Sequence, residues 1–238
     1  GEIECFNALA GFAFNYPEFA YPSVVQRDTP YIEATKMAHP LIPEAERVAN
    51  DLKAGESNKL LLITGSNMSG KTTFLRTLGI NLILAQSGAP VCAAAFVFTP
   101  VEILTSIRIN DSLQEHTSYF MAELKRLQQI ILRLQDKVSA LVLIDEILRG
   151  TNSGDKTSGS EQFIKQLLQY NCLTLFATHD LALASLEEEY NGLVSNYCFE
   201  SRIQDGILRF DYTLQRGVAR NKNASFLMKK MGIIKGDG

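Results

Sequence analysis

Residues 65–72 constrain the fold of this chain more than any other feature. They read GSNMSGKT, a complete GxxxxGK motif followed by threonine, and they come directly after the apolar run 60–63. An apolar run of this length is typical of a buried strand, and the amphipathic stretch after the motif is typical of a helix. A strand, a glycine-rich loop and a helix in this order predict a phosphate-binding loop.

The residue types of this loop suit a nucleotide. Gly65 and Gly70 permit the backbone angles that turn successive N–H groups toward a phosphate, and the helix N-terminus adds a favourable dipole. We expect Lys71 to reach the β- and γ-phosphates and Thr72 to give a hydroxyl oxygen to Mg²⁺. The predicted ATP-binding residues of the loop are Gly65, Ser66, Asn67, Met68, Ser69, Gly70, Lys71, Thr72 and Thr73.

Two further apolar runs end in polar side chains of the kind that ATP hydrolysis needs. Residues 141–144 are aliphatic and precede Asp145 and Glu146, which is a Walker B pattern. Asp145 is predicted to hold the magnesium shell and Glu146 to polarise the attacking water. Residues 173–177 precede a threonine and then His179, which we expect to sense or stabilise the γ-phosphate, although a lone histidine after a strand is more often structural. The predicted catalytic residues are Glu146, His179 and Lys71, and the predicted metal ligands are Thr72 and Asp145.

From residue 60 onward, short apolar runs alternate with longer amphipathic ones, which is typical of strands joined by crossover helices. Asp205 and Gly206, between two alternating runs, give a strong signal for a two-residue hairpin. The predicted fold is therefore an α/β P-loop NTPase of the ABC-like type, with a mostly parallel sheet flanked by helices and an antiparallel edge hairpin. The strand candidates are residues 60–64, 91–98, 101–109, 140–145 and 172–177, with helices after the first, third, fourth and fifth.

Composition excludes some classes of protein. The formal net charge is −3 in 238 residues, so the totals do not suggest a surface built to bind nucleic acid. The four cysteines are far apart and form no CxxC pair, so we expect core thiols rather than a zinc site or a disulfide framework. The uncharged run 77–101 has the length of a membrane span, but polar residues, Gly88 and Pro90 interrupt it, so a buried helix, a turn and a strand are expected.

Several motifs together resemble those of the MutS family of DNA mismatch repair proteins. Residues 64–76, TGSNMSGKTTFLR, are similar to the family's phosphate loop, in which the Asn-Met pair is distinctive. Residues 145–153, DEILRGTNS, resemble its Walker B motif with the following loop, and residues 176–179, FATH, resemble its switch-histidine segment. The segment SYFMAE at 118–123 resembles the stretch whose serine reaches a partner's nucleotide.

The resemblance implies a composite dimer that couples ATP hydrolysis to DNA. In such a homodimer, Ser118, Asn152 and Ser153 would act on the ATP of the partner, and the nucleotide state would be linked to clamp movements on (mismatched) DNA. If the chain is a piece of a longer parent protein, contact with DNA is expected mostly through parts of that protein outside this chain. The chain begins with Gly rather than Met, so we expect a piece of a longer, cytoplasmic protein, with residues 1–30 as the end of a helical lever or clamp domain and its connector, and residues 31–238 as the ATPase domain.

The sequence also departs from the family pattern. Ser66 stands where the family usually has proline, Leu148 where it usually has glycine, and Lys156 where a glycine usually follows the aspartate. The loop after Walker B is thus expected to be less pliable and hydrolysis slower. Arg47 and Val48 fall where mismatch repair members carry an aromatic residue near adenine, so stacking by Arg47 or packing by Val48 would replace it.

Three alternatives compete with an ATPase of this kind. A non-hydrolysing module, in which ATP only joins two subunits of a MutS-like protein acting on other DNA structures, would not need Glu146 and His179. A transporter-type cassette would need an LSGGQ-like signature before Walker B, which the chain lacks. A small-molecule phosphotransferase would need a lid-like cluster of arginines, and none is visible.

Overall fold

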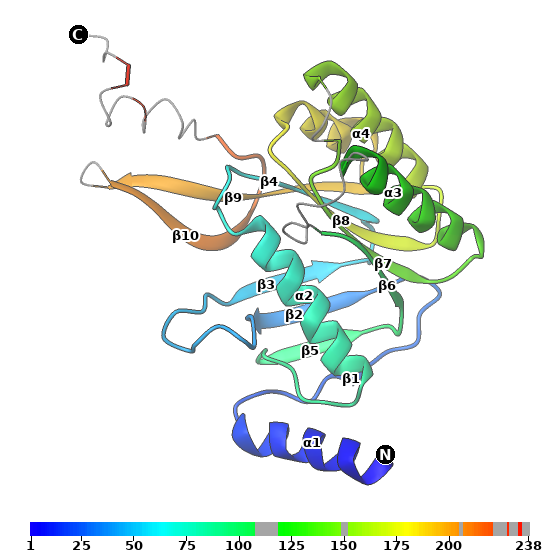
Figure 1. Cartoon of the computed structure of the whole chain (residues 1–238), viewed down its shortest axis with the longest axis vertical. Coiled ribbons are helices and arrows are strands. Elements are labelled where there is room, and N and C mark those ends of the chain that lie inside the picture. The colour runs from blue at the N-terminus through cyan, green and yellow to red at the C-terminus, as the bar shows by residue number, and fades with distance from the viewer. Residues whose placement is uncertain (108–118, 149–151, 205–206, 221–227, 229–232, 235–238) are drawn as a thin grey trace.

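The computed structural model describes residues 1–107, 119–148, 152–204, 207–220, 228 and 233–234 (Figure 1). Helices and strands alternate along most of the chain, as the sequence predicts for an α/β protein. The elements in chain order are α1 (Glu2–Asn15), β1 (Ser23–Val24), β2 (Ile32–Met37), β3 (Asn50–Ala54), β4 (Leu60–Thr64), α2 (Lys71–Gln86), β5 (Ala95–Phe98), β6 (Glu102–Ser106), α3 (Tyr119–Gln135), β7 (Ala140–Asp145), α4 (Ser153–Leu167), β8 (Cys172–Thr178), the 3-10 helix η1 (Leu181–Ser185), α5 (Leu186–Glu189), β9 (Val194–Gln204) and β10 (Ile207–Arg216).

A six-stranded sheet forms the centre of the molecule. Its strand order is β10-β9-β4-β8-β7-β6, and every pairing is parallel except that of β9 with β10. Strands β4, β7 and β8 are buried along their whole length because helices or strands cover both faces. The predicted mostly parallel sheet with an antiparallel hairpin at its edge is confirmed.

A second, four-stranded sheet was not predicted, and it corrects one assignment. Residues 91–98 were expected to join the parallel sheet, but only Ala95–Phe98 form a strand, β5, and it lies in a separate sheet of order β1-β5-β2-β3. Strand β5 pairs antiparallel with β2, and β2 pairs antiparallel with β3. Phe96 and Phe98 are buried on this sheet. The apolar run therefore predicted a strand correctly, but it could not indicate which strand would pair with it.

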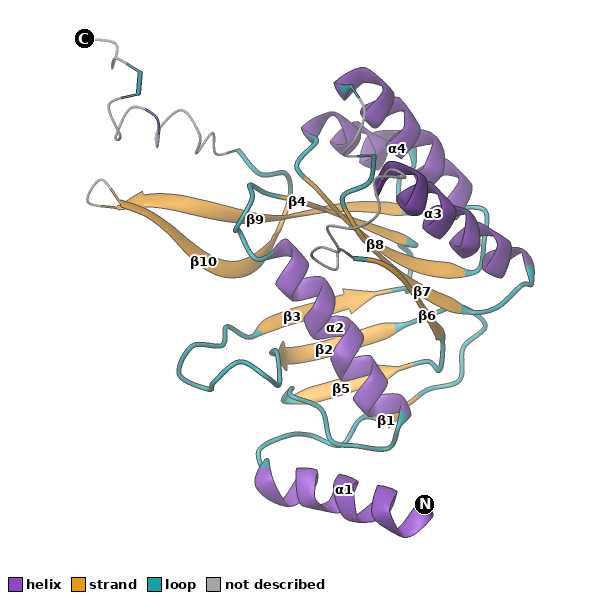
Figure 2. Ribbon diagram, viewed as in Figure 1, coloured by secondary structure: helices purple, strands orange, loops and turns teal. Residues whose placement is uncertain are grey.

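Two hydrophobic clusters pack against opposite faces of the six-stranded sheet. One joins α2 and the second sheet to side chains such as Leu61, Ile63 and Leu143. The other joins α3, α4 and α5 to the side chains that alternate with these, such as Leu62 and Val142. Figure 2 shows α3 and α4 together on one side, while α2 runs beside the four-stranded sheet. Helix α2 is therefore held between two sheets, and its N-terminus points at the end of β4.

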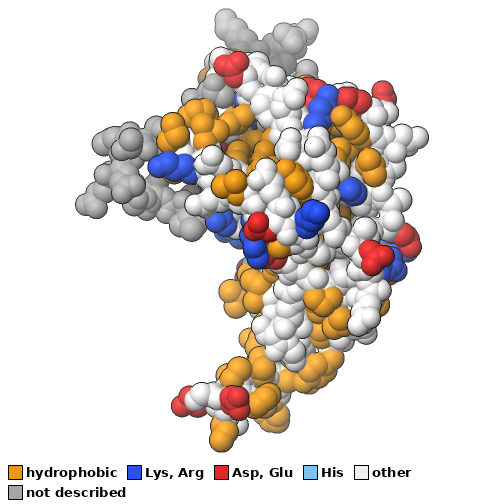
Figure 3. Space-filling model, turned by 90° about the vertical axis from the view of Figure 1, so that its right-hand side faces the viewer, with side chains coloured by type: hydrophobic (Ala, Val, Ile, Leu, Met, Phe, Trp, Pro, Cys, Tyr) orange, Lys and Arg blue, Asp and Glu red, His pale blue; other side chains and the backbone are white. Residues whose placement is uncertain are grey.

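The N-terminal helix lies apart from these clusters. Helix α1 is 14 residues long, but none of its residues is buried, and Ile3, Phe6 and Phe14 are largely exposed. Figure 3 shows hydrophobic side chains gathered on this projecting end of the molecule. Cys5 on this helix is exposed, unlike the other three cysteines, so the expectation of four core thiols is wrong at this position.

Helix α3 turns an apolar stripe toward the sheet, and part of that stripe is exposed. The apolar stripe of α3 is buried at Leu127 and Leu134 but not at Met121, which is 46% exposed near the start of the helix. Among the described residues, no helix is both long enough and apolar enough to cross a membrane.

Candidate functional site

The glycine-rich loop 65–70 connects β4 to α2 at the edge of the sheet where β7 and β8 also end. Open α/β sheets place their ligands at this carboxyl edge. A cavity of about 530 Å³ lies beside the loop and extends along α2 toward residues 37–50. Gly70 precedes the helix with a φ of 106°, a left-handed conformation that favours glycine.

The lysine of the loop is folded back onto the loop itself. The Lys71 ammonium is buried and donates to the carbonyl oxygens of Gly65, at 2.7 Å, and of Ser66, at 2.9 Å. The Ser69 hydroxyl is also buried, and among the described residues it has no hydrogen-bond partner. A buried cation and an unsatisfied hydroxyl in one loop are the groups that an incoming phosphate could engage.

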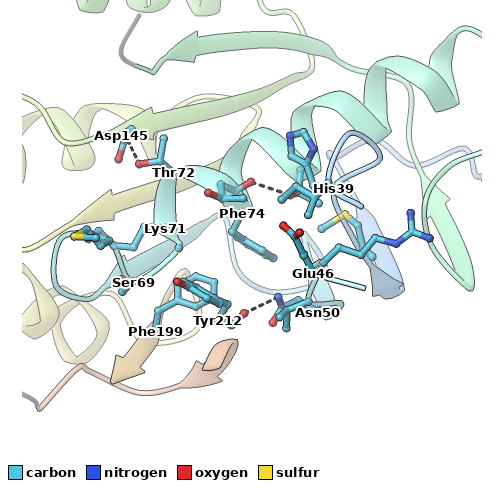
Figure 4. Close-up of a pocket in the computed structure, with 18 of the residues that line it drawn as sticks. His39, Glu46, Asn50, Ser69, Lys71, Thr72, Phe74, Asp145, Phe199 and Tyr212 are labelled. Carbon is cyan, nitrogen blue, oxygen red and sulfur yellow. Dashed lines mark hydrogen bonds between the residues drawn. The ribbon is translucent and has the colours of Figure 1, made fainter. Parts of the chain in front are cut away.

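Two predicted metal ligands meet directly. The Thr72 hydroxyl at the start of α2 donates to Asp145 Oδ2 at the end of β7, at 2.8 Å (Figure 4). Hydroxyl and carboxylate oxygens are ligands that Mg²⁺ accepts, and this cation usually keeps waters and phosphate oxygens as its other ligands. No group of three or more His, Cys, Asp or Glu side chains suited to a metal occurs in the described part of the chain, and a magnesium site that uses phosphates does not need one.

Glu146 and His179 form the second pair at this edge. Glu146 follows Asp145 with a φ of 50°, and its carboxylate contacts His179 after the end of β8. His179 Nδ1 lies 2.9 Å from Glu146 Oε1; the glutamate side chain is 5% exposed, whereas that of the histidine is 51% exposed. The predicted catalytic pair is therefore brought together by the ends of two neighbouring strands, β7 and β8.

The end of the cavity away from the Thr72–Asp145 pair includes Tyr212 and Asn50, which the sequence did not single out. Tyr212 lies in an irregularity of β10 with a φ of 54°, and its ring would be only 3.0 Å from a Cβ at Gly70. Asn50 of β3 holds this irregular segment from both sides: its amide nitrogen donates to the Tyr212 carbonyl at 3.0 Å, and its amide oxygen accepts from Leu214 N–H at 2.6 Å. Figure 4 shows the labelled residues of this part, which are His39, Glu46, Asn50, Phe74, Phe199 and Tyr212.

The predicted adenine-side residues line the cavity, but one of them has partners of its own. Arg47 Nη1 donates to Cys92 Sγ at 3.3 Å, its Nη2 lies 3.6 Å from Glu18, and its guanidinium lies 5.4 Å from the Phe19 ring centroid. Burial raises the pKa of the Cys92 thiol, so it stays protonated beside the arginine. Val48 is 40% exposed and also lines the cavity.

The His39 side chain is a neutral polar group that lines the cavity near Arg47 and Val48. Burial, assisted by the Arg76 guanidinium, lowers the pKa of His39, so the imidazole is uncharged at neutral pH. Its Nδ1 accepts a hydrogen bond from Leu41 N–H at 3.2 Å, which leaves Nε2 as the protonated nitrogen.

The residues predicted to act on a partner's nucleotide are not part of this cavity. Asn152 and Ser153 are exposed at the start of α4, where the Asn152 side chain caps the helix by accepting from Asp155 N–H at 2.9 Å. Ser118 lies outside the described residues.

Comparison with known proteins gives consistent matches. Residues 61–232 match the family described as MutS domain V. The chain is 38% identical over 196 residues to "MutS protein homolog 4" of Mus musculus, which covers 78% of this chain and 20% of the relative. It is 33% identical over 242 residues to "DNA mismatch repair protein MutS" of Clostridium kluyveri, a match that covers 98% of this chain and 27% of the relative. It is also 33% identical over 210 residues to "Endonuclease MutS2" of Thermus thermophilus, a match that covers 84% of this chain and 26% of the relative. The chain thus spans about a fifth to a quarter of the length of these relatives.

Proposed function

The chain belongs to the MutS family through its domain V, and on this premise we propose that it binds ATP with Mg²⁺ and hydrolyses it to ADP and phosphate. The observation that carries the proposal is the placement of two polar pairs at one sheet edge. The pairs are Thr72 with Asp145 and Glu146 with His179, and both lie next to the phosphate loop.

The role of each residue follows from its chemistry. Lys71 would exchange the loop carbonyls for phosphate oxygens, which are stronger acceptors for an ammonium. Thr72 and Asp145 would hold Mg²⁺, which when bound neutralises charge on the phosphates and orients them. Glu146 would accept a proton from the attacking water, and His179 would hold the carboxylate in place.

Base recognition is proposed to involve Tyr212 rather than Arg47. The Tyr212 ring lines the cavity beside Gly70. The backbone that carries it is held by two hydrogen bonds of the Asn50 side chain, to the Tyr212 carbonyl and the Leu214 N–H, which we call the Asn50 clamp. Arg47 is already engaged with Cys92 and Glu18, so stacking on a base would require it to leave these partners. Val48 remains available to pack on one face of the base.

We test hydrolysis by phosphate release from the 238-residue chain in MgATP. Glu146→Gln should abolish release while ATP still binds, because the amide keeps the shape of the carboxylate but cannot accept the proton. Addition of excess EDTA should also stop release. Lys165→Met, far along α4, serves as the matched control and should release phosphate at the rate of the unaltered chain.

A non-hydrolysing role is the second candidate, and one observation favours it. Leu148, two residues after Glu146, has a φ of 58°, so the loop that leaves the catalytic residue is strained in a way that a glycine would not be. The same assay separates the two functions. Binding of MgATP without phosphate release by the unaltered chain, alone and in the parent protein, would establish the non-hydrolysing module.

Coupling to DNA is proposed for the parent protein, as the name of the Clostridium kluyveri relative suggests. We would measure phosphate release by the parent with a duplex that contains a mismatch and with a perfectly paired duplex. A mismatch-dependent rate would support a repair sensor. Equal rates on both duplexes would indicate a MutS-like ATPase with another role.

A further inference from the structure

His179 has a second polar neighbour, on α4. Lys156 Nζ lies 3.2 Å from His179 Nε2, whereas Glu146 Oε1 contacts the other ring nitrogen, Nδ1. The imidazole is thus placed between an ammonium on one nitrogen and a carboxylate on the other.

The chemistry of the three groups assigns the proton on the ring. A lysine ammonium has three donors and no acceptor, so His179 Nε2 must accept the hydrogen bond and cannot carry a proton. In the neutral ring the proton then resides on Nδ1, which donates to Glu146 Oε1. The opposite tautomer would place a lone pair against the carboxylate and an N–H against the ammonium, so both contacts would be lost.

The start of α4 is built to keep Lys156 at this place. Asn152 caps the helix: its side-chain oxygen accepts from Asp155 N–H at 2.9 Å and its backbone carbonyl accepts from Lys156 N–H at 3.0 Å. The next residue, Thr157, donates its hydroxyl to Asp180 Oδ2. Two adjacent side chains of the helix therefore contact two adjacent residues after β8, which fixes the distance between the two elements.

We propose that Lys156 is a positioning residue that selects the Nδ1–H tautomer of His179 and thereby orients the Glu146 carboxylate for hydrolysis. The inference rests on the proposed ATPase function for its kinetic consequence, but the tautomer itself exists without nucleotide. Lys156 does not touch the reacting atoms in this arrangement. It acts through the imidazole.

The tautomer can be read directly by NMR. The chain has three histidines, so ¹⁵N-histidine labelling gives few signals, and the signals of residue 179 are identified by their absence in His179→Gln. In the unaltered chain without nucleotide we expect the long-range proton–nitrogen pattern of an Nδ1–H ring. Lys156→Met keeps the length of the side chain but removes the donor. Because Glu146 still accepts from Nδ1–H, we expect the fraction of the Nε2–H form to rise measurably rather than to replace the Nδ1–H form entirely.

Kinetics provide the second measurement. Lys156→Met should lower kcat by roughly 10- to 100-fold, by analogy with the loss of an outer-shell partner that orients a metal ligand, with little change in KM. Lys156→Arg retains a donor and should restore the Nδ1–H pattern and part of the rate. The control is Lys165→Met on the same helix, whose ammonium contacts Glu161 and Glu189 instead.

The outcomes are distinguishable. An Nε2–H ring in the unaltered chain, or an unchanged NMR pattern in Lys156→Met, overturns the proposal whatever the enzyme does. A shifted tautomer with an unchanged kcat also overturns it, because the tautomer would then have no bearing on Glu146. If the unaltered chain releases no phosphate, the proposed function fails, and the NMR result alone decides whether Lys156 selects the tautomer.

Discussion

Leu148 and Gly159 show how a single residue can set the conformation of the loop behind Glu146. Leu148 has a left-handed φ of 58°, which costs of order 1 kcal/mol or more in a residue with a side chain. Its side chain packs against the hydrophobic cluster that joins α3, α4 and α5 to the six-stranded sheet. A Cβ at Gly159 would lie only 2.5 Å from Leu148 Cδ1. The absence of a side chain at Gly159 therefore makes room for Leu148.

Gly159→Ala should displace Leu148 and with it the loop. Alanine gains helix propensity of up to about 1 kcal/mol at either glycine of α4, so we expect the free energy of unfolding of Gly159→Ala to lie about 1–3 kcal/mol below that of Gly154→Ala, the usual cost of overpacking, and phosphate release to slow. Urea unfolding measures the first effect. The control is Gly154→Ala on the same helix, where the new Cβ would meet only Asn152 Oδ1 at 3.6 Å and should be neutral or stabilising. Equal stability of the two variants would contradict the packing argument.

Tyr212 tests the proposed site of the base. Tyr212→Ala should weaken ATP binding by about tenfold, since stacking of one base on an aromatic ring is worth about 1–3 kcal/mol. Tyr212→Phe keeps the ring and should bind ATP almost as the unaltered chain does. Titration calorimetry in the Glu146→Gln background avoids turnover, and Tyr21→Ala, at an exposed tyrosine outside the cavity, is the control. Unchanged affinity in Tyr212→Ala would place the base elsewhere.

At the scale of elements, the cavity depends on contact between the second sheet and the hairpin. Asn50 of β3 makes two hydrogen bonds to β10, to the Tyr212 carbonyl and the Leu214 N–H. Asn50→Leu would leave both backbone groups without this partner, which costs roughly 1–3 kcal/mol for a buried group. We expect a lower unfolding free energy and a weaker ATP affinity together, because the irregular segment that presents Tyr212 would relax.

The matched control for this prediction lies on the same strand. Lys53 of β3 forms an exposed ion pair with Glu56, and Lys53→Ala should change stability by less than about 1 kcal/mol. Loss of stability in Asn50→Leu without loss of ATP affinity would show that the clamp supports the fold but does not position the tyrosine.

The sequence predicts well those elements whose position and type are determined by their own local residue pattern. Strand β4 is a continuous buried run followed by the phosphate loop, and the hairpin of β9 and β10 follows from local alternation and a turn signal. Strand β3 was missed because its buried positions alternate with charged residues such as Asp51 and Lys53 over only five residues. Pairing of β5 with β2 joins segments about 60 residues apart, and no local pattern specifies such a partner.

The same reason explains which site residues the sequence reveals. Lys71, Thr72, Asp145, Glu146 and His179 follow strands of the parallel sheet, so their convergence at its edge could be expected from topology alone. Tyr212 and Asn50 reach the cavity only through the irregularity in β10 and the contact of two sheets. Their roles become visible only once the fold is known.

At the scale of the whole molecule, the cavity is bounded by groups from both sheets, yet the predicted trans-acting residues lie outside it. Asn152 and Ser153 are exposed at the N-terminus of α4, on the same helix as Lys156. A helix N-terminus favours negative charge, so this end of α4 is suited to the phosphates of a nucleotide held by a second copy. A composite site of this kind would join two molecules through two ATP molecules.

We therefore expect MgATP to convert a monomer into a dimer. A ligand that binds the dimer more tightly than the monomer stabilises the dimer by mass action, by about 1.4 kcal/mol per site for each tenfold difference between the two Kd values at saturating ligand. Sedimentation velocity of Glu146→Gln, which retains ATP, should show a dimer with MgATP and a monomer with MgADP or without nucleotide. Ser153→Glu should abolish the dimer by charge repulsion from the phosphates while each monomer still binds ATP. A Ser153→Glu chain that dimerises with MgATP as readily as its parent would exclude this face of α4 from the interface, and the partner's contribution would have to come from another surface.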